Sequence, residues 1–181
     1  MAILSTRTSI VLIGPGGAGK STVGARLAER LGIGFVDLDR RFADRAWDIS
    51  EYIDRFGYHA YARMNVETYC ALLSESDADA RVVALSSGFM TYPHDSHPDY
   101  TQLRCDIEQR PTTLVLLPSL DREICVAETV RRQLTRPFAR SAAREEAVIR
   151  ERFPIYVGLR ARKVETMRSV EAIVDELIVS V

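Results

Sequence analysis

The residues with the clearest chemical meaning form a glycine-rich run at positions 14–21 that ends in a lysine and a hydroxyl. The run, Gly-Pro-Gly-Gly-Ala-Gly-Lys-Ser, fits the phosphate-binding pattern G-x-x-x-x-G-K-[ST]. Glycines permit positive φ and bring backbone N–H groups close to phosphate oxygens. Lys20 can reach the β- and γ-phosphates of a nucleotide, and the Ser21 hydroxyl can ligate Mg²⁺. The sequence therefore predicts an ATP and Mg²⁺ site built by Gly14, Gly16, Gly17, Ala18, Gly19, Lys20 and Ser21.

The segments on either side of this run are those that a phosphate-binding loop needs. Ser9–Ile13 is typical of a buried strand, and Lys20–Leu31 has the apolar spacing of a helix. The N-terminus of that helix would add unpaired N–H donors and the positive end of its dipole. A glycine-rich turn with no ligand is the alternative interpretation. The register of strand, loop, lysine, hydroxyl and helix argues against it.

Apolar β-branched runs alternate with helical patterns along the rest of the chain, which indicates a parallel sheet covered by helices on both faces. We expect a long helical stretch up to about Ser74, interrupted near Gly57. The sequence contains no internal repeat and no stretch typical of a linker, so we expect one domain over residues 1–181. The other expected strands are Phe35–Leu38, Arg81–Leu85, Thr112–Leu117 and Lys163–Thr166, and the other expected helices are Leu120–Leu134 and Ser169–Val179.

The composition excludes several classes of protein. Hydrophobic residues make up 46% and charged residues 27%, as in ordinary globular proteins. The net charge of -1 provides no basic field that would attract nucleic acid or an anionic membrane. The 3 cysteines form no CxxC pair, so we expect reduced thiols rather than a disulfide framework or a zinc site. Because no basic-then-apolar leader and no apolar run of ~18 residues occurs, a cytoplasmic location is expected.

Two carboxylates follow the second expected strand as Asp37-Leu-Asp39. Residues i and i+2 of a strand face the same way, so both side chains are expected to point toward the ligand crevice. One carboxylate could bind in the magnesium shell while the other receives the proton of an acceptor hydroxyl. A solvated acidic turn, or a helix cap at Asp39, is the alternative. The small size of the chain and the lack of an N-K-x-D guanine signature favour a small-molecule kinase over a nucleotide switch.

With its later motifs, the chain resembles the shikimate kinase family. Asp37-x-Asp39 stands where that family has D-x-D, and the loop continues into Thr22-Val-Gly24 as the family's does. Ala62-Arg63-x-x-x-Glu67 is similar to the family's F-R-x-x-E. Arg136-Pro137 is similar to the R-P of its lid, and Arg152-x-Pro154-x-Tyr156 to its late R-x-P-L-Y segment. The resemblance therefore extends over most of the chain.

This resemblance implies a three-layer P-loop kinase fold with a five-stranded parallel sheet, a helical substrate-binding region at about 38–75 and a lid at about 135–143. It implies an ATP-dependent enzyme that phosphorylates shikimate, with a nucleotide site extending to Thr22 and to Arg132, which stacks on adenine. Asp39 would bind the acceptor hydroxyl and act as base, and Asp37 would hold Mg²⁺ through water. The remaining roles are clamping of the acceptor carboxylate by Arg63 and Arg152 beside Gly88, and closure over the transferred phosphate by Arg136, preferred to Arg140.

The chain departs from the family where the third strand ends. The family has a T-G-G-G run that lies against the acceptor, whereas this chain has Ser86 and Ser87 before Gly88. Serine adds bulk and a hydroxyl where close backbone approach is needed. A different carboxylate-bearing or hydroxylated acceptor, such as a cyclitol, a sugar acid or a specialised metabolite, is therefore a second hypothesis. A catalytically silent nucleotide-binding homologue is a third, and the presence of Lys20, Ser21 and both aspartates speaks against it.

A second departure is the long segment 89–110, which we expect to be a loop insertion near the acceptor. It carries His94, His97 and Asp99, which suggest a metal site, but a proline-flanked segment with two histidines is more typical of a surface loop. The segment could also wall off the acceptor. A monomer or a weak homo-oligomer is expected.

Overall fold

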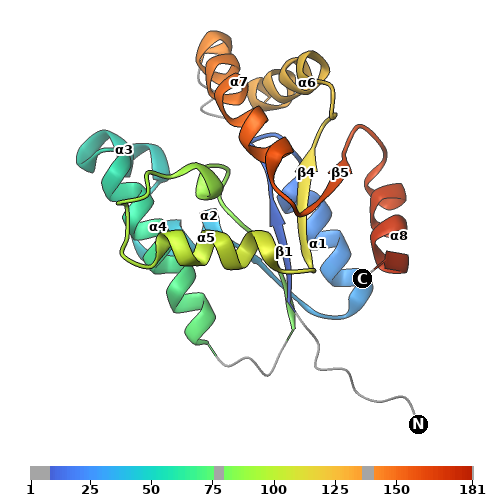
Figure 1. The fold of residues 1–181 in the computed structure, drawn as a ribbon, viewed down its shortest axis with the longest axis horizontal. Coiled ribbons are helices and arrows are strands. Elements are labelled where there is room, and N and C mark those ends of the chain that lie inside the picture. Colours follow the sequence, from blue (N-terminus) through green and yellow to red (C-terminus); the bar gives the residue numbers. More distant parts are fainter. Residues whose placement is uncertain (1–8, 76–79, 136–140, 181) are drawn as a thin grey trace.

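The computed structural model describes residues 9–75, 80–135 and 141–180, which form a three-layer α/β fold (Figure 1). Its centre is one sheet of five strands in the order β2-β3-β1-β4-β5. Every neighbouring pair is parallel, which confirms the expected sheet. The strands are β1 (Ile10–Ile13), β2 (Gly34–Asp37), β3 (Arg81–Ala84), β4 (Thr113–Leu117) and β5 (Arg162–Glu165).

Helices cover both faces of this sheet (Figure 1). Side chains of β1 alternate between the faces: Leu12 packs with α1 and α8 in one core, and Ile13 packs in a second core with α2, α4 and α7. None of the described helices is both long enough and apolar enough to cross a membrane. The helices are α1 (Lys20–Leu31), α2 (Leu38–Arg45), α3 (Ile49–Phe56), α4 (Tyr58–Ser74), the 3-10 turn η1 (Phe89–Thr91), α5 (Tyr100–Gln109), α6 (Arg122–Leu134), α7 (Ala142–Gly158) and α8 (Val170–Ser180).

The segment 89–110 is not the loop that we expected. It contains η1 and the ten residues of α5, and its Tyr100 side chain is fully buried. The Tyr100 hydroxyl donates to Phe89 O at 2.7 Å and accepts from Tyr92 N at 3.0 Å. These bonds join η1 to the first residue of α5, and all three residues are buried in the core. Among the described residues, His94, His97 and Asp99 do not form a group that could hold a metal ion, and His97 Nδ1 accepts from Asp99 N at 3.1 Å within a turn.

The two aspartates after β2 also differ from expectation. The strand ends at Asp37, and Asp39 lies in the first turn of α2 rather than in the strand. Asp37 caps this helix, because its Oδ1 accepts from Asp39 N at 3.0 Å and from Arg40 N at 3.4 Å. The strand periodicity of two residues was therefore the wrong argument for the orientation of the two aspartates. The residue that caps α2 is Asp37 rather than Asp39.

The C-terminal third contains a helix that the sequence patterns did not reveal. Helix α7 runs for 17 residues with Pro154 inside it, and its start is capped by Ser141, whose side chain accepts from Arg144 N. This helix carries Arg152. The expected lid over 135–143 falls largely outside the described residues, and so do both of its arginines, Arg136 and Arg140.

Candidate functional site

The glycine-rich loop has the backbone that its sequence requires. Gly14, Gly17 and Gly19 have φ of 144°, 74° and 91°. A Cβ on Gly14 would lie 2.2 Å from Leu116 O, so a side chain there would collide with the backbone of β4. The loop therefore needs glycine both for its dihedral angles and for its closeness to the sheet. Gly19 is the N-cap of α1, and as a glycine it provides no side-chain hydrogen bond to the start of that helix.

Lys20 is the first residue of α1 and is buried. Its Nζ donates to Gly14 O at 2.7 Å and to Pro15 O at 3.0 Å. The ammonium group therefore lies inside the curve of the loop. A charge in this position, together with the N–H groups of the helix start, is suited to bind a phosphate.

Ser21 and Asp37 meet at the mouth of this loop. The Ser21 hydroxyl donates to Asp37 Oδ2 at 2.5 Å, although the two residues come from α1 and β2. A hydroxyl and a carboxylate together form an oxygen donor set of the kind that Mg²⁺ accepts. In the described ranges, no group of three or more His, Cys, Asp or Glu side chains could hold a metal ion. A site with two protein oxygens suits a magnesium ion whose other ligands are phosphate and water.

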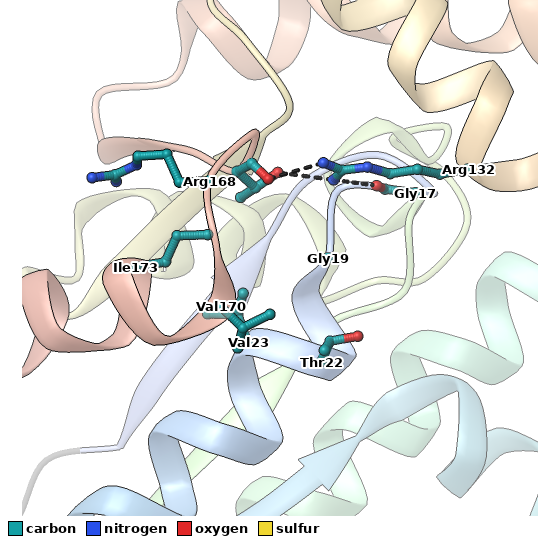
Figure 2. Close-up of a pocket in the computed structure, with 9 residues that line it drawn as sticks. Gly17, Gly19, Thr22, Val23, Arg132, Arg168, Val170 and Ile173 are labelled. Carbon is teal, nitrogen blue, oxygen red and sulfur yellow. Dashed lines mark hydrogen bonds between the residues drawn. The ribbon is translucent and has the colours of Figure 1, made fainter.

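A cavity of ≈ 300 Å³ adjoins the loop (Figure 2). Arg132 closes one side of it: its Nη1 donates to Gly17 O and to Thr166 Oγ1, both at 3.1 Å, and its Nη2 donates to Thr166 O at 2.9 Å. Apolar side chains of α1 and α8 form the opposite side, as Figure 2 shows for Val23 and Ile173. This cavity is therefore the candidate for the predicted adenine site. The cavity is lined by Gly17, Gly19, Thr22, Val23, Arg132, Thr166, Arg168, Val170 and Ile173.

Glu128 holds Arg132 in place beside this cavity. Its Oε1 accepts from Arg132 Nε at 2.6 Å, and its Oε2 accepts from Arg131 Nε at 2.7 Å. The hydrogen bond with Arg131, followed by that with Arg132, lowers the pKa of the Glu128 carboxyl to about 2, although burial acts in the opposite direction. Glu128 is therefore a charged anchor for the arginine expected to stack on adenine.

A second group of residues lies where β3 ends. A Cβ on Gly88 would lie 2.7 Å from Tyr58 Oη and 3.2 Å from Arg152 Nη2. The structure therefore brings together Gly88 and Arg152, two of the residues expected to bind the acceptor. Arg63 is an exposed side chain on α4 whose Nε donates to Glu67 Oε1 at 3.2 Å. Its predicted contact with the acceptor stays a prediction.

The two serines that replace the family's glycines have different surroundings. Ser86 is buried, and its Oγ accepts from Asn65 Nδ2 at 3.0 Å. Asn65 Oδ1 in turn accepts from Tyr92 Oη at 3.1 Å, so Ser86 belongs to a satisfied polar network in the core. Ser87 differs, because its Oγ accepts from Arg152 Nη1 at 3.5 Å. Of the two serines, Ser87 is therefore the one that contacts Arg152 beside Gly88.

Asp39, in the first turn of α2, acts on the same group through its charge. Burial, and after it the charge of Asp39, raises the pKa of Tyr61. The ring of Tyr61 lies 5.8 Å from that of Tyr58 and 6.0 Å from that of Tyr92. Asp39 is thus close to the aromatic side chains that surround Gly88. Sequence reasoning missed Tyr58 and Asn65, for which no motif gave a signal.

Comparisons with known proteins point to one family. A family model described as "SKI: Shikimate kinase" matches residues 16–181. The shikimate kinase of Thermobifida fusca is 32% identical over 97% of this chain and 95% of its own length. That of Mycobacterium avium is 34% identical over 94% of this chain and 90% of its own. Among solved structures, the shikimate kinase of Acinetobacter baumannii in complex with shikimate matches with a TM-score of 0.74 and 22% identity, over 94% of this chain and 90% of that one.

Proposed function

Because this chain belongs to the shikimate kinase family, we propose that it transfers the γ-phosphate of ATP to a hydroxyl of shikimate. The observation that carries this proposal is the position of two groups of residues around the carboxyl ends of the strands. A loop with a buried lysine lies at the end of β1. Gly88 and Arg152 lie together beyond the end of β3, and Asp39 lies in the first turn of the helix that follows β2. Ligands of parallel α/β sheets bind at this edge.

The nucleotide would be held by the loop. Its backbone N–H groups and the start of α1 are suited to the phosphates. Lys20 would exchange its bonds to Gly14 O and Pro15 O for bonds to phosphate oxygens. Such bonds join two charged groups and are the stronger kind. The cavity beside Arg132 would take the adenine.

Ser21 and Asp37 would hold magnesium, Asp37 through water. Their oxygens fit the ion because they already converge on one point beside the loop. When bound, Mg²⁺ neutralises charge on the β- and γ-phosphate oxygens.

The acceptor would lie between Asp39 and Arg152. In the transfer, an acceptor oxygen forms a bond to the γ-phosphorus while the bond from that phosphorus to ADP breaks, and the hydroxyl proton passes to Asp39. Arg152, with Arg63, would bind the carboxylate of the acceptor, which suits the fork geometry of guanidinium. Catalysis would come mainly from positioning and charge.

A coupled assay of ADP release with shikimate tests the proposal. We expect turnover with shikimate, and slower or no turnover with quinate, gluconate or myo-inositol at the same concentration. Calorimetry with ATP on the same preparation shows that the protein is intact. Bound ATP without turnover of shikimate contradicts the proposed acceptor, and turnover of a compound without a carboxylate contradicts the arginine clamp.

A further inference from the structure

Arg152 differs from other arginines near the site because its described partners are hydroxyl groups. Its Nη2 donates to Tyr58 Oη at 3.1 Å, and its Nη1 donates to Ser87 Oγ at 3.5 Å. In the described part of the chain, it forms no ion pair with a carboxylate. Two residues earlier on the same helix, Arg150 is paired with two glutamates, and Arg63 is paired with Glu67.

The kind of partner matters for an anion receptor. A carboxylate partner would orient the guanidinium and also compensate its charge. A hydroxyl partner orients the planar guanidinium and leaves the positive charge uncompensated. The hydroxyl partners therefore orient the guanidinium of Arg152, and its positive charge can still pair with an incoming anion.

Tyr58 reaches Arg152 from a well-defined position. It is the first residue of α4, directly after Gly57, whose φ is 84°. Its ring packs edge-on against Tyr92, with centroids 5.9 Å apart and an interplanar angle of 71°. Its hydroxyl lies 2.7 Å from the place that a Cβ on Gly88 would take. A side chain at position 88 would therefore collide with the Tyr58 hydroxyl, so glycine there is a condition for the contact with Arg152.

We propose that Tyr58 is a positioning residue that holds Arg152 toward the carboxylate of the acceptor, with Ser87 as a second support. The identity of the acceptor rests on the proposed function. Tyr58 belongs to α4, Ser87 follows β3, and Arg152 belongs to α7, so the contact joins three separate segments at the expected acceptor site. It also gives a role to Ser87, which stands where the resemblance places a glycine.

The first test needs no acceptor. In ¹⁵N-labelled full-length protein, the Arg152 Nε–Hε signal is assigned by its loss in Arg152→Lys, and the rotation of the guanidinium is measured by exchange. We expect Tyr58→Phe to speed this rotation severalfold because a bond to Nη2 is lost. Tyr52→Phe is the matched control, since the Tyr52 ring packs against Phe42 on another part of the helical region. Unchanged rotation in Tyr58→Phe overturns the proposal.

The second test measures kinetics. Loss of one hydrogen bond to a charged but partly exposed group should raise the KM for shikimate about fivefold in Tyr58→Phe. The kcat and the KM for ATP should stay within about twofold, since neither the transferred phosphate nor the base is affected. A purely structural role would change all three values together. Faster rotation with an unchanged KM for shikimate overturns the role in acceptor binding. If the wild-type protein does not phosphorylate shikimate, the proposed function fails. The rotation measurement then tests by itself whether Tyr58 positions Arg152.

Discussion

The Ser21 hydroxyl and Asp37 Oδ2 lie 2.5 Å apart, which joins the first turn of α1 to the end of β2. The same carboxylate has a second task, because its Oδ1 accepts from Asp39 N and Arg40 N at the start of α2. One side chain thus faces the phosphate-binding loop and fixes the helix that carries Asp39. This one residue therefore links the expected magnesium ligands to the helix of the expected base.

We expect Asp37→Asn to keep the fold and lose metal-dependent activity. The amide oxygen can still cap α2, but the negative charge beside Ser21 is gone. Loss of a group that holds a metal through water costs about 10–100-fold in metal affinity or activity. The measurement is the rate as a function of Mg²⁺ concentration. Asp48→Asn is the control, since Asp48 caps α3 in the same way, through Ser50 N and Glu51 N. Equal behaviour of the two variants would rule out the metal role of Asp37.

Lys20→Met should strongly lower the rate of transfer, because it removes the ammonium group that is expected to face the phosphates. Removal of one such charged donor costs at least about 10²-fold in kcat. Lys163, on β5, is the other lysine of the chain, and its Nζ donates to Leu159 O. Lys163→Met removes the same charge outside the loop and should keep nearly full activity. Parallel losses in the two variants would show that the effect of Lys20 is not specific.

Glu128 should make the stability depend on pH in acid. Its folded-state pKa is lowered from 4.5 to about 2, so the unfolded chain binds a proton more readily than the folded one. The stabilisation is therefore complete above the unfolded pKa and is lost as the pH falls toward 2. The difference in Tm between wild type and Glu128→Gln should be present at pH 7 and shrink between about pH 4.5 and 2. Glu151→Gln, on an exposed part of α7, is the control, and a pH-independent difference for Glu128 would refute the assignment.

The nucleotide loop could be predicted from sequence because its chemistry is local. Gly14, Lys20 and Ser21 lie within one strand, turn and helix, and backbone geometry alone brings them together. The periodicity of the flanking segments then identified β1 and α1 almost to the residue. The sheet followed in the same way, from short apolar runs that alternate with helical patterns.

The candidate acceptor site could be predicted only in part, since distant segments build it. Tyr58 and Arg152 are 94 positions apart, and no local pattern indicates that they meet. The same holds for Asn65 and Ser86, whose hydrogen bond shows that one serine faces the core. Helix α5 was missed because proline and histidine at its start suggested a loop, whereas the buried Tyr100 stabilises the segment through the tertiary fold.

The substitution of two helical glycines should have opposite effects on stability. A Cβ on Gly24 in α1 would lie 2.6 Å from Phe35 Cε2 and 3.0 Å from Leu12 Cδ1. Gly24→Ala should therefore destabilise by about 1–3 kcal/mol, because overpacking exceeds the gain in helix propensity. Gly158 has no atom within 4 Å of its added Cβ, so Gly158→Ala should stabilise α7, by at most about 1 kcal/mol. Urea unfolding measures both. Stabilisation by Gly24→Ala would contradict the packing of α1 on β2.

Asp39→Asn separates a kinase from a nucleotide-binding protein without catalysis. The amide cannot take the proton of the acceptor hydroxyl, and loss of a general base lowers the rate about 10²–10⁴-fold. The affinity for ATP should stay the same, because the loop and Lys20 are untouched. Asp44→Asn, on the same helix, removes an equal charge and is the control for long-range electrostatics. Single-turnover rates and calorimetry with ATP give the two values. A silent homologue has no transfer step for Asp39 to assist. An unchanged rate in Asp39→Asn would therefore show that Asp39 is not the base. A lower rate with unchanged ATP binding would place the defect in the transfer step itself.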